Sequence, residues 1–208
     1  MEGNKEWPWN TCEVCGRDYQ RPKGFCPYCR KQKLWDEKTM AQRVPVLSPR
    51  LLSEIKKHKN YSFPTHPASS MFLTGPAGTG KTVFAAKVLH DLMEDNYING
   101  VFVRPQFLTI DQLTDEIRAC YDQKKSDLPV IQKYKDCDWL FLDDFGAKAT
   151  NDWVYSILYS IINYRYEQLK PLVVISNLSL EEIAQNLQDE RLTRRVKEMS
   201  EVVYRFEK

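Results

Sequence analysis

Beyond residue 70 the chain alternates short apolar runs with longer stretches in which apolar residues recur every three or four positions. The short runs are predicted to be strands, at 71–73, 101–103, 139–142, 172–175 and 201–206. The longer stretches are predicted to be helices, at 82–94, 109–122 and 152–168. Strands that alternate with helices predict an α/β domain whose parallel sheet is covered on both faces.

Two short motifs predict where helices begin. Thr109 is followed three positions later by Gln112, and Ser179 in the same way by Glu182. A hydroxyl and a longer acceptor at this spacing can satisfy two of the backbone N–H groups that a helix N-terminus leaves unpaired. We therefore expect one helix to begin after Thr109 and another after Ser179.

The first 66 residues lack this alternation. Residues 1–32 hold cysteines, aromatic residues and prolines without a helical period, whereas residues 33–66 are rich in charge and contain several prolines. Within the second stretch, 51–59 is predicted to be a short helix. The expected organisation is therefore a small module (1–32), a linker with one short helix (33–66) and a larger domain (67–208).

Composition favours a soluble protein of the cytoplasm. Of the 208 residues 42% are hydrophobic and 28% are charged, and the first ten lack the apolar core of a secretory signal. No apolar run approaches the ~20 residues that span a bilayer, so no membrane partner is expected. The net charge is only +2, although residues 1–50 carry ten Lys or Arg against six Asp or Glu. That excess is too small to indicate nucleic-acid binding by charge alone.

The segment after the first predicted strand fits a phosphate-binding loop. Its sequence, GPAGTGKT, has the pattern G-x-x-x-x-G-K-[ST] and leads into a predicted helix. The glycines let the backbone curl so that several N–H groups and the positive end of the helix face one point. Lys81 is expected to reach the β- and γ-phosphates of ATP, and the Thr82 hydroxyl to bind Mg²⁺. The predicted ATP or ADP contacts are Gly75, Pro76, Ala77, Gly78, Thr79, Gly80, Lys81, Thr82 and Asp143.

The apolar run 139–142 ends in two acids, Asp143 and Asp144. A buried parallel strand delivers its last residues to the sheet edge at which ligands bind. Asp143 is therefore expected to hold Mg²⁺ and Asp144 to polarise the attacking water, as in a Walker B motif. The alternative is an acidic turn after a strand, which the phosphate loop upstream disfavours.

Two further groups are candidates for the chemistry. Asn177 lies at the polar tip of the strand 172–175 and could orient water against the γ-phosphate, although Ser-Asn is also an ordinary turn. Arg191 and Arg195 could supply positive charge to the ATP of a neighbouring subunit. The alternative for the arginines is a basic, solvated helix face.

Four cysteines near the N-terminus have the spacing of a zinc site. They form two C-x₂-C pairs separated by ten residues, and such pairs can present four thiolates to one tetrahedral Zn²⁺. The zinc would be structural, because no position is left for water, and it would supply folding energy that so small a module lacks. Disulfides are the alternative, but the reducing cytoplasm disfavours them. The predicted zinc ligands are Cys12, Cys15, Cys26 and Cys29, whereas Cys120 and Cys137 are expected to be ordinary core residues.

Aromatic residues surround these cysteines and alternate with Lys and Arg. Such a surface could stack on single-stranded DNA. It could equally be the small core of the module together with a face that docks on protein. Both interpretations remain open from the sequence.

The order and spacing of GPAGTGKT, LFLDDFG, LYSIINYRY, VVISNLS and DERLTRRV resemble those of the DnaC/DnaI/IstB-like AAA+ ATPases over about residues 50–208. The resemblance implies the AAA+ core, a P-loop parallel sheet of strand order 5-1-4-3-2. It also implies that Asn177 is the sensor 1 residue and that Arg195, or else Arg191, is an arginine finger. Asp144 replaces the Glu of many relatives. The sequence ends soon after its last predicted strand, which predicts little or no helical lid and no usual sensor 2 arginine.

Loaders of the DnaI type resemble this chain in having a zinc-bearing N-terminal module, so the resemblance implies that a zinc-ribbon-like module contacts the replicative helicase. The implied function is ATP-dependent loading of that helicase in DNA replication, with ATP, Mg²⁺ and Zn²⁺ as cofactors. The implied partners are the helicase, single-stranded DNA and further copies of this chain in an ATP-bridged assembly. The short module would suit a bacterial protein encoded by a phage or a plasmid.

Three other functions compete with this hypothesis. An IstB-like transposition ATPase would act on duplex DNA with a transposase. An adaptor that binds ATP but hydrolyses it slowly would fit the shorter Asp144. A small-molecule kinase is disfavoured, because the sequence shows neither a mobile lid with arginines nor an acceptor pocket.

Overall fold

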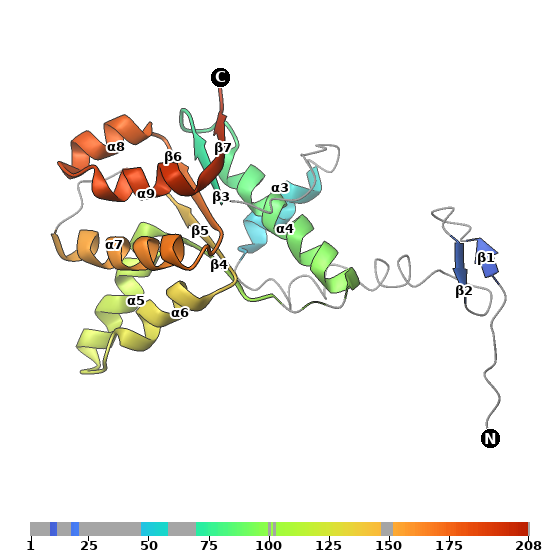
Figure 1. Cartoon of the computed structure of the whole chain (residues 1–208), viewed down its shortest axis with the longest axis horizontal. Helices are drawn as coiled ribbons and strands as arrows, with labels where there is room; N and C mark the ends of the chain where they lie inside the picture. Colours follow the sequence, from blue (N-terminus) through green and yellow to red (C-terminus); the bar gives the residue numbers. More distant parts are fainter. Residues whose placement is uncertain are drawn as a thin grey trace. The chain divides into compact units, whose positions relative to one another are not determined.

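The computed structural model describes residues 9–11, 18–20, 47–57, 70–99, 101, 103–146 and 152–207 (Figure 1). Two compact units are present, one made of residues 1–45 and 93–102 and the other of residues 46–92 and 103–208. Among the described residues of the first unit are β1 (Trp9–Thr11) and β2 (Asp18–Gln20), which pair antiparallel. The zinc ligands predicted at Cys12, Cys15, Cys26 and Cys29 lie outside the described residues.

The second unit is built on a five-stranded parallel sheet. Its strands are β3 (Ser70–Thr74), β4 (Pro105–Thr109), β5 (Trp139–Asp143), β6 (Leu172–Ser176) and β7 (Ser200–Arg205). They lie in the order β4-β5-β6-β3-β7, and every neighbouring pair is parallel. Numbered along the chain and read from β7, this is the order 5-1-4-3-2, so the predicted α/β class with its parallel P-loop sheet is confirmed. The three central strands, β5, β6 and β3, are buried along their whole length.

Helices cover both faces of this sheet (Figure 1). On one side lie α3 (Pro49–Lys57) and α4 (Lys81–Asn99). The others are α5 (Ile110–Asp122), α6 (Leu128–Asp136), α7 (Asp152–Glu167), α8 (Leu180–Leu187) and α9 (Arg191–Met199). The main core lies beneath this second group, where Leu140, Leu142 and Val174 of the sheet pack with Ile161 and Ile162 of α7. Within the described part of the chain no helix is both long and apolar enough to span a bilayer.

The strand predicted at 101–103 is wrong. Val101 and Val103 lie outside any strand, and the edge strand β4 begins at Pro105 instead. Proline cannot donate to a sheet ladder, so it is tolerated at the first position of an edge strand such as this one. The prediction relied on the apolar Val-Phe-Val sequence, but these residues precede the strand and do not form it.

Both predicted capping boxes are present. The Thr109 hydroxyl accepts from the Gln112 N–H at 3.1 Å and the Gln112 side chain accepts from the Thr109 N–H at 2.9 Å, which starts α5. Ser179 and Glu182 make the same reciprocal pair at 3.2 and 2.7 Å and start α8. The local sequence thus fixes where these two helices begin.

Replacing Ser179 with alanine is expected to cost about 1 kcal/mol of unfolding free energy, because the Glu182 N–H at the start of α8 loses the hydroxyl that accepts from it. Urea denaturation, monitored by circular dichroism, measures this unfolding free energy. Ser156→Ala is the matched control, since Ser156 is exposed within α7 and only bonds back to the Asp152 carbonyl. Equal unfolding free energies for the two variants would contradict the assigned role of the cap.

Candidate nucleotide-binding site

The loop between β3 and α4 has a backbone that requires glycine. Gly75, Gly78 and Gly80 have φ angles of +143°, +81° and +90°, which side chains disfavour. At Gly75 a Cβ would also collide with the carbonyl oxygen of Phe206. Phe206 donates its N–H to the Thr74 carbonyl at 2.8 Å, so the segment after β7 fixes the start of the loop. The curled loop lies at the N-terminus of α4, whose free N–H groups favour a bound anion.

Lys81 is the first residue of α4 and is buried. Its Nζ donates to the carbonyls of Gly75 and Pro76 at 2.7 and 2.8 Å. Burial lowers the pKa of this ammonium, and the nearby carboxylates of Asp143 and Asp144 partly offset that effect. The loop therefore closes around a buried positive charge that a phosphate could reach.

Thr82 and Asp143 bring two oxygen atoms together beside that lysine. The Thr82 hydroxyl donates to Asp143 Oδ2 at 2.8 Å, although the two residues lie on α4 and at the end of β5. Burial raises the pKa of Asp143, and hydrogen bonds from Thr82 and from the Asp144 N–H partly offset that rise. A hydroxyl and a carboxylate in contact form a donor set suited to Mg²⁺, which prefers oxygen ligands.

Asp144 is held in an exposed and unusual backbone position. Its φ is +56°, a region that residues other than glycine rarely occupy, and its N–H donates to Asp143 Oδ1 at 2.9 Å. The next residue is anchored from both sides: the Phe145 N–H donates to the Ile175 carbonyl at 2.9 Å, and its carbonyl accepts from the Ser176 hydroxyl at 2.5 Å. These bonds direct the Asp144 side chain out of the sheet edge, where it is exposed to solvent.

A cavity of about 350 Å³ is lined by most of the residues that the sequence predicts for the nucleotide site. Lys81, Thr82, Asp143, Asp144 and Asn177 line it, together with Ala77, Gly78 and Gly80 of the loop. Their chemical roles stay predictions, but the structure places them around one space.

Sequence reasoning missed two residues that line the same cavity, Arg50 and Glu54 of α3. The helix itself was expected at 51–59, but only as part of a linker. No sequence signal points from that helix to the phosphate loop, because their proximity depends on the tertiary fold.

A second cavity, of about 450 Å³, adjoins the first and shares Gly78, Gly80 and Val83 with it. Its walls are mainly apolar and aromatic. The rings of Tyr204 and Phe206 lie 5.1 and 5.4 Å from that of Phe84, measured between centroids. A charged cavity next to an aromatic one suits a ligand with a phosphate end and a flat, apolar end.

Arg191 and Arg195 do not line either cavity. Both lie on α9 and bond within their own chain. Arg191 binds Asp189 through two nitrogen atoms at 3.0 and 2.7 Å, and Arg195 binds Asn163 and Glu198, both at 3.2 Å. Within one protomer neither guanidinium faces the predicted phosphate site, so a catalytic role would require a neighbouring subunit.

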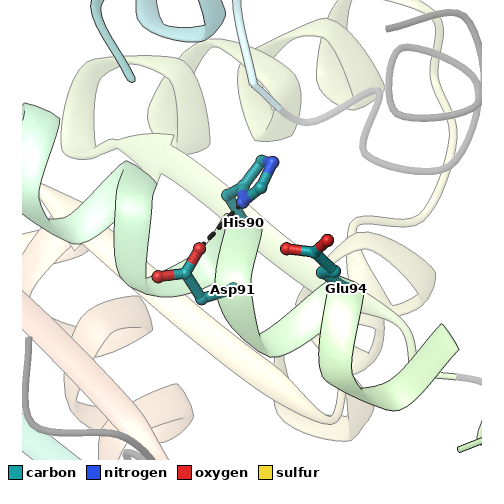
Figure 2. A group of neighbouring side chains, drawn as sticks. All are labelled: His90, Asp91 and Glu94. Carbon is teal, nitrogen blue, oxygen red and sulfur yellow. Dashed lines mark hydrogen bonds and ion pairs between the residues drawn. The ribbon is translucent and has the colours of Figure 1, made fainter. Parts of the chain in front are cut away.

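A separate group on α4 has the residue types of a metal site. Figure 2 shows His90, Asp91 and Glu94 as neighbours along that helix, with a 2.9 Å hydrogen bond between His90 Nδ1 and Asp91. The Asp91 carboxylate is already in an ion pair with Lys87. Burial alone would raise the pKa of Asp91, but hydrogen bonds from His90 and Lys87 lower it. We assign no metal to this group, because the Asp91 carboxylate is already neutralised by Lys87.

Comparison with known proteins identifies relatives of this chain. The sequence profile of the family described as IstB-like ATP binding protein matches residues 33–200. Phage-like element PBSX protein XkdC of Bacillus subtilis (strain 168) is 29% identical over 140 residues, which cover 63% of this chain and 47% of that protein. The chain thus spans about half the length of this curated relative.

Solved structures share the fold. The DnaC helicase loader superposes with a TM-score of 0.57 at 24% identity, covering 76% of this chain and 89% of that chain. The replication initiator DnaA bound to AMPPCP and single-stranded DNA superposes with a TM-score of 0.55 at 19% identity, covering 83% and 51%. At these identities the similarity establishes the common fold.

Proposed function

This chain belongs to the family of IstB-like ATP binding proteins, and from that premise we propose that it is a Mg²⁺-dependent ATPase that loads a replicative helicase onto DNA. The observation that carries the ATPase part is the 350 Å³ cavity in which Lys81, Thr82 and Asp143 meet. The adjoining aromatic cavity would take the adenine base.

The cavity residues that were predicted from the sequence have proposed roles in hydrolysis. The loop N–H groups and Lys81 bind the phosphates and neutralise charge as the terminal bond breaks. Thr82 and Asp143 would hold Mg²⁺, which would withdraw charge from the phosphates. Asp144 and Asn177 orient water for attack on the γ-phosphorus. As the new P–O bond forms, the bond to the β,γ-bridging oxygen breaks, and Asp144 accepts the proton of the water.

The loading role is supported by fold similarity and not by the site itself. The DnaC structure is that of a helicase loader, and the DnaA structure contains single-stranded DNA. We propose that copies of this chain assemble through ATP, with Arg195 or Arg191 approaching the nucleotide of a neighbour. The N-terminal cysteine module would bind zinc and contact the helicase, and the chain would act in the cytoplasm of a bacterium.

The second candidate is a transposition ATPase that acts on duplex DNA, and the match to the IstB-like family profile favours it. An adaptor with little turnover is the remaining alternative, because Asp144 has a shorter side chain than the Glu expected at that position. These functions differ in which DNA stimulates hydrolysis and in whether hydrolysis occurs at all.

The test combines the purified full chain with the replicative helicase of its bacterial host, with ATP, with ADP or without nucleotide. We expect a helicase complex on size-exclusion chromatography that depends on ATP, and phosphate release that increases with single-stranded DNA. A Cys12→Ser/Cys15→Ser variant should bind ATP as before and lose the helicase.

The other outcomes discriminate between the candidates. If the helicase is bound in no nucleotide state, the loader assignment fails. Stimulation by duplex DNA alone would support the transposition ATPase. A helicase complex without measurable phosphate release would support the adaptor.

A further inference from the structure

Helix α3 lies against the nucleotide site although it precedes the phosphate loop in sequence. Figure 1 shows α3 beside α4, and Ile55 of α3 lines the aromatic cavity together with Val83 and Phe84 of α4. Ile55 is only 3% exposed, so this side of the helix is held in place by burial. Arg50, on the turn before Ile55, and Glu54, next to Ile55, line the charged cavity.

The first turn of α3 has a defined backbone. Pro49 is its first residue, where a fixed φ favours the helix and no N–H is required. The Ser48 hydroxyl accepts from the Leu51 N–H at 3.3 Å, which caps the same turn. Arg50 is therefore presented from a rigid element and not from a loop.

Arg50 differs from the two candidate arginines of α9. Its side chain is exposed, and within the part of the chain that the structure describes it makes no hydrogen bond or ion pair. Arg191 and Arg195, in contrast, are engaged with Asp189 and Glu198. An available guanidinium at the wall of a phosphate cavity can bind phosphate oxygens through two parallel hydrogen bonds.

The charges around the cavity indicate what such a guanidinium would bind. Asp143, Asp144 and Glu54 bring negative charge, whereas Lys81 and Arg50 are the cationic side chains that line it among the described residues. Lys81 lies inside the curl of the loop, from which it would reach the β- and γ-phosphates. Arg50 lies on the separate element α3, and can therefore meet a phosphate that extends beyond the loop.

We propose that Arg50 is a ligand of the γ-phosphate of the ATP bound by the same chain, so that α3 distinguishes ATP from ADP. This proposal rests on the proposed nucleotide binding. The guanidinium adds positive charge where Asp144 would otherwise repel the terminal phosphate, whereas Glu54 is already paired with Lys57 at 2.7 Å. After hydrolysis that contact is lost, and ADP retains only the contacts of the loop and of the aromatic cavity.

The experiment measures binding of AMPPCP and of ADP to the full chain with Mg²⁺ by isothermal titration calorimetry. Arg50→Gln is expected to weaken AMPPCP binding by on the order of 10-fold or more, because a charge-assisted contact is lost. ADP binding should change by less than about twofold, since no γ-phosphate is present. Arg50→Lys keeps the charge without the planar fork and should lie between Arg50→Gln and the unchanged protein for AMPPCP.

Lys56→Gln is the matched control, because Lys56 is exposed on the same helix and lines neither cavity. It should leave both affinities unchanged. A loss of AMPPCP and ADP binding in equal measure in Arg50→Gln would overturn the proposal, and so would no change in either. If the unchanged protein binds neither ligand, the proposed nucleotide function fails as well. If it binds both, and the ratio of the AMPPCP and ADP affinities is the same in Arg50→Gln, only the assignment of Arg50 fails.

Discussion

Replacement of Lys81 by alanine is expected to lower ATP turnover by on the order of 10²–10³-fold, the typical loss when one preorganised charge donor is removed from a transition state. Lys81 is buried at the centre of the phosphate loop, and no other cationic side chain among the described residues reaches the loop carbonyls that it binds. Steady-state release of phosphate at saturating ATP measures the effect.

The control for this variant is Lys197→Ala, which removes an exposed lysine of α9 that lines neither cavity. Its turnover should match that of the unchanged protein. Thermal melting must show that Lys81→Ala remains folded, because the lysine also holds the carbonyls of Gly75 and Pro76. Undiminished turnover in a folded Lys81→Ala protein would show that hydrolysis does not take place at this loop.

Local signals explain why much of this fold could be predicted from the sequence. The phosphate loop is recognisable because its glycines, lysine and threonine act within eight consecutive residues. The capping boxes of α5 and α8 likewise depend on side chains three positions apart. The order of the sheet followed from the resemblance, and the uniformly buried strands β3, β5 and β6 fit the continuous apolar runs seen in the sequence.

Features that depend on tertiary contacts were not predictable in the same way. Helix α6 was not expected from the sequence. The position of Arg50 and Glu54 at the cavity depends on how α3 packs against α4. The left-handed conformation of Asp144 depends on bonds from the neighbouring strand β6 to Phe145.

Arg165 is the clearest case of a residue whose role only the fold reveals. The sequence placed it on a long apolar helix, and the structure buries it completely within α7. Its Nη1 donates to the carbonyls of Tyr134 and Cys137 at 3.0 and 2.9 Å, and its Nη2 donates to the carbonyl of Pro171 at 2.6 Å. Burial lowers the pKa of this guanidinium, and the neighbouring Cys137 partly offsets that effect.

These contacts satisfy backbone groups that have few other partners. Tyr134 and Lys135 belong to the last turn of α6, where helix carbonyls lack intrahelical donors, and Pro171 immediately precedes β6. A single buried side chain thus joins the end of α6 to the start of two strands, since Cys137 lies just before β5. Arg165 therefore supplies hydrogen-bond donors to backbone carbonyls where the end of α6 meets the starts of β5 and β6, away from the nucleotide site.

Arg165→Met is therefore expected to lower the unfolding free energy by about 3 kcal/mol or more, because several buried carbonyls lose their donor while the aliphatic volume is largely kept. For a protein of this size that corresponds to a fall in Tm of roughly 6–12 °C, which differential scanning calorimetry would measure. Arg118→Met is the control, since that side chain is 59% exposed and its contacts are a 3.8 Å ion pair with Asp115 and a cation–π contact 6.0 Å from the centre of the Trp153 ring. If both variants melt within a degree or so of the unchanged protein, water or rearranged backbone must replace the guanidinium. The packing of α6 against β5 and β6 would then not depend on Arg165. A selective loss in Arg165→Met would instead show that one buried charge, bonded mainly to backbone carbonyls, can stabilise the packing of three elements.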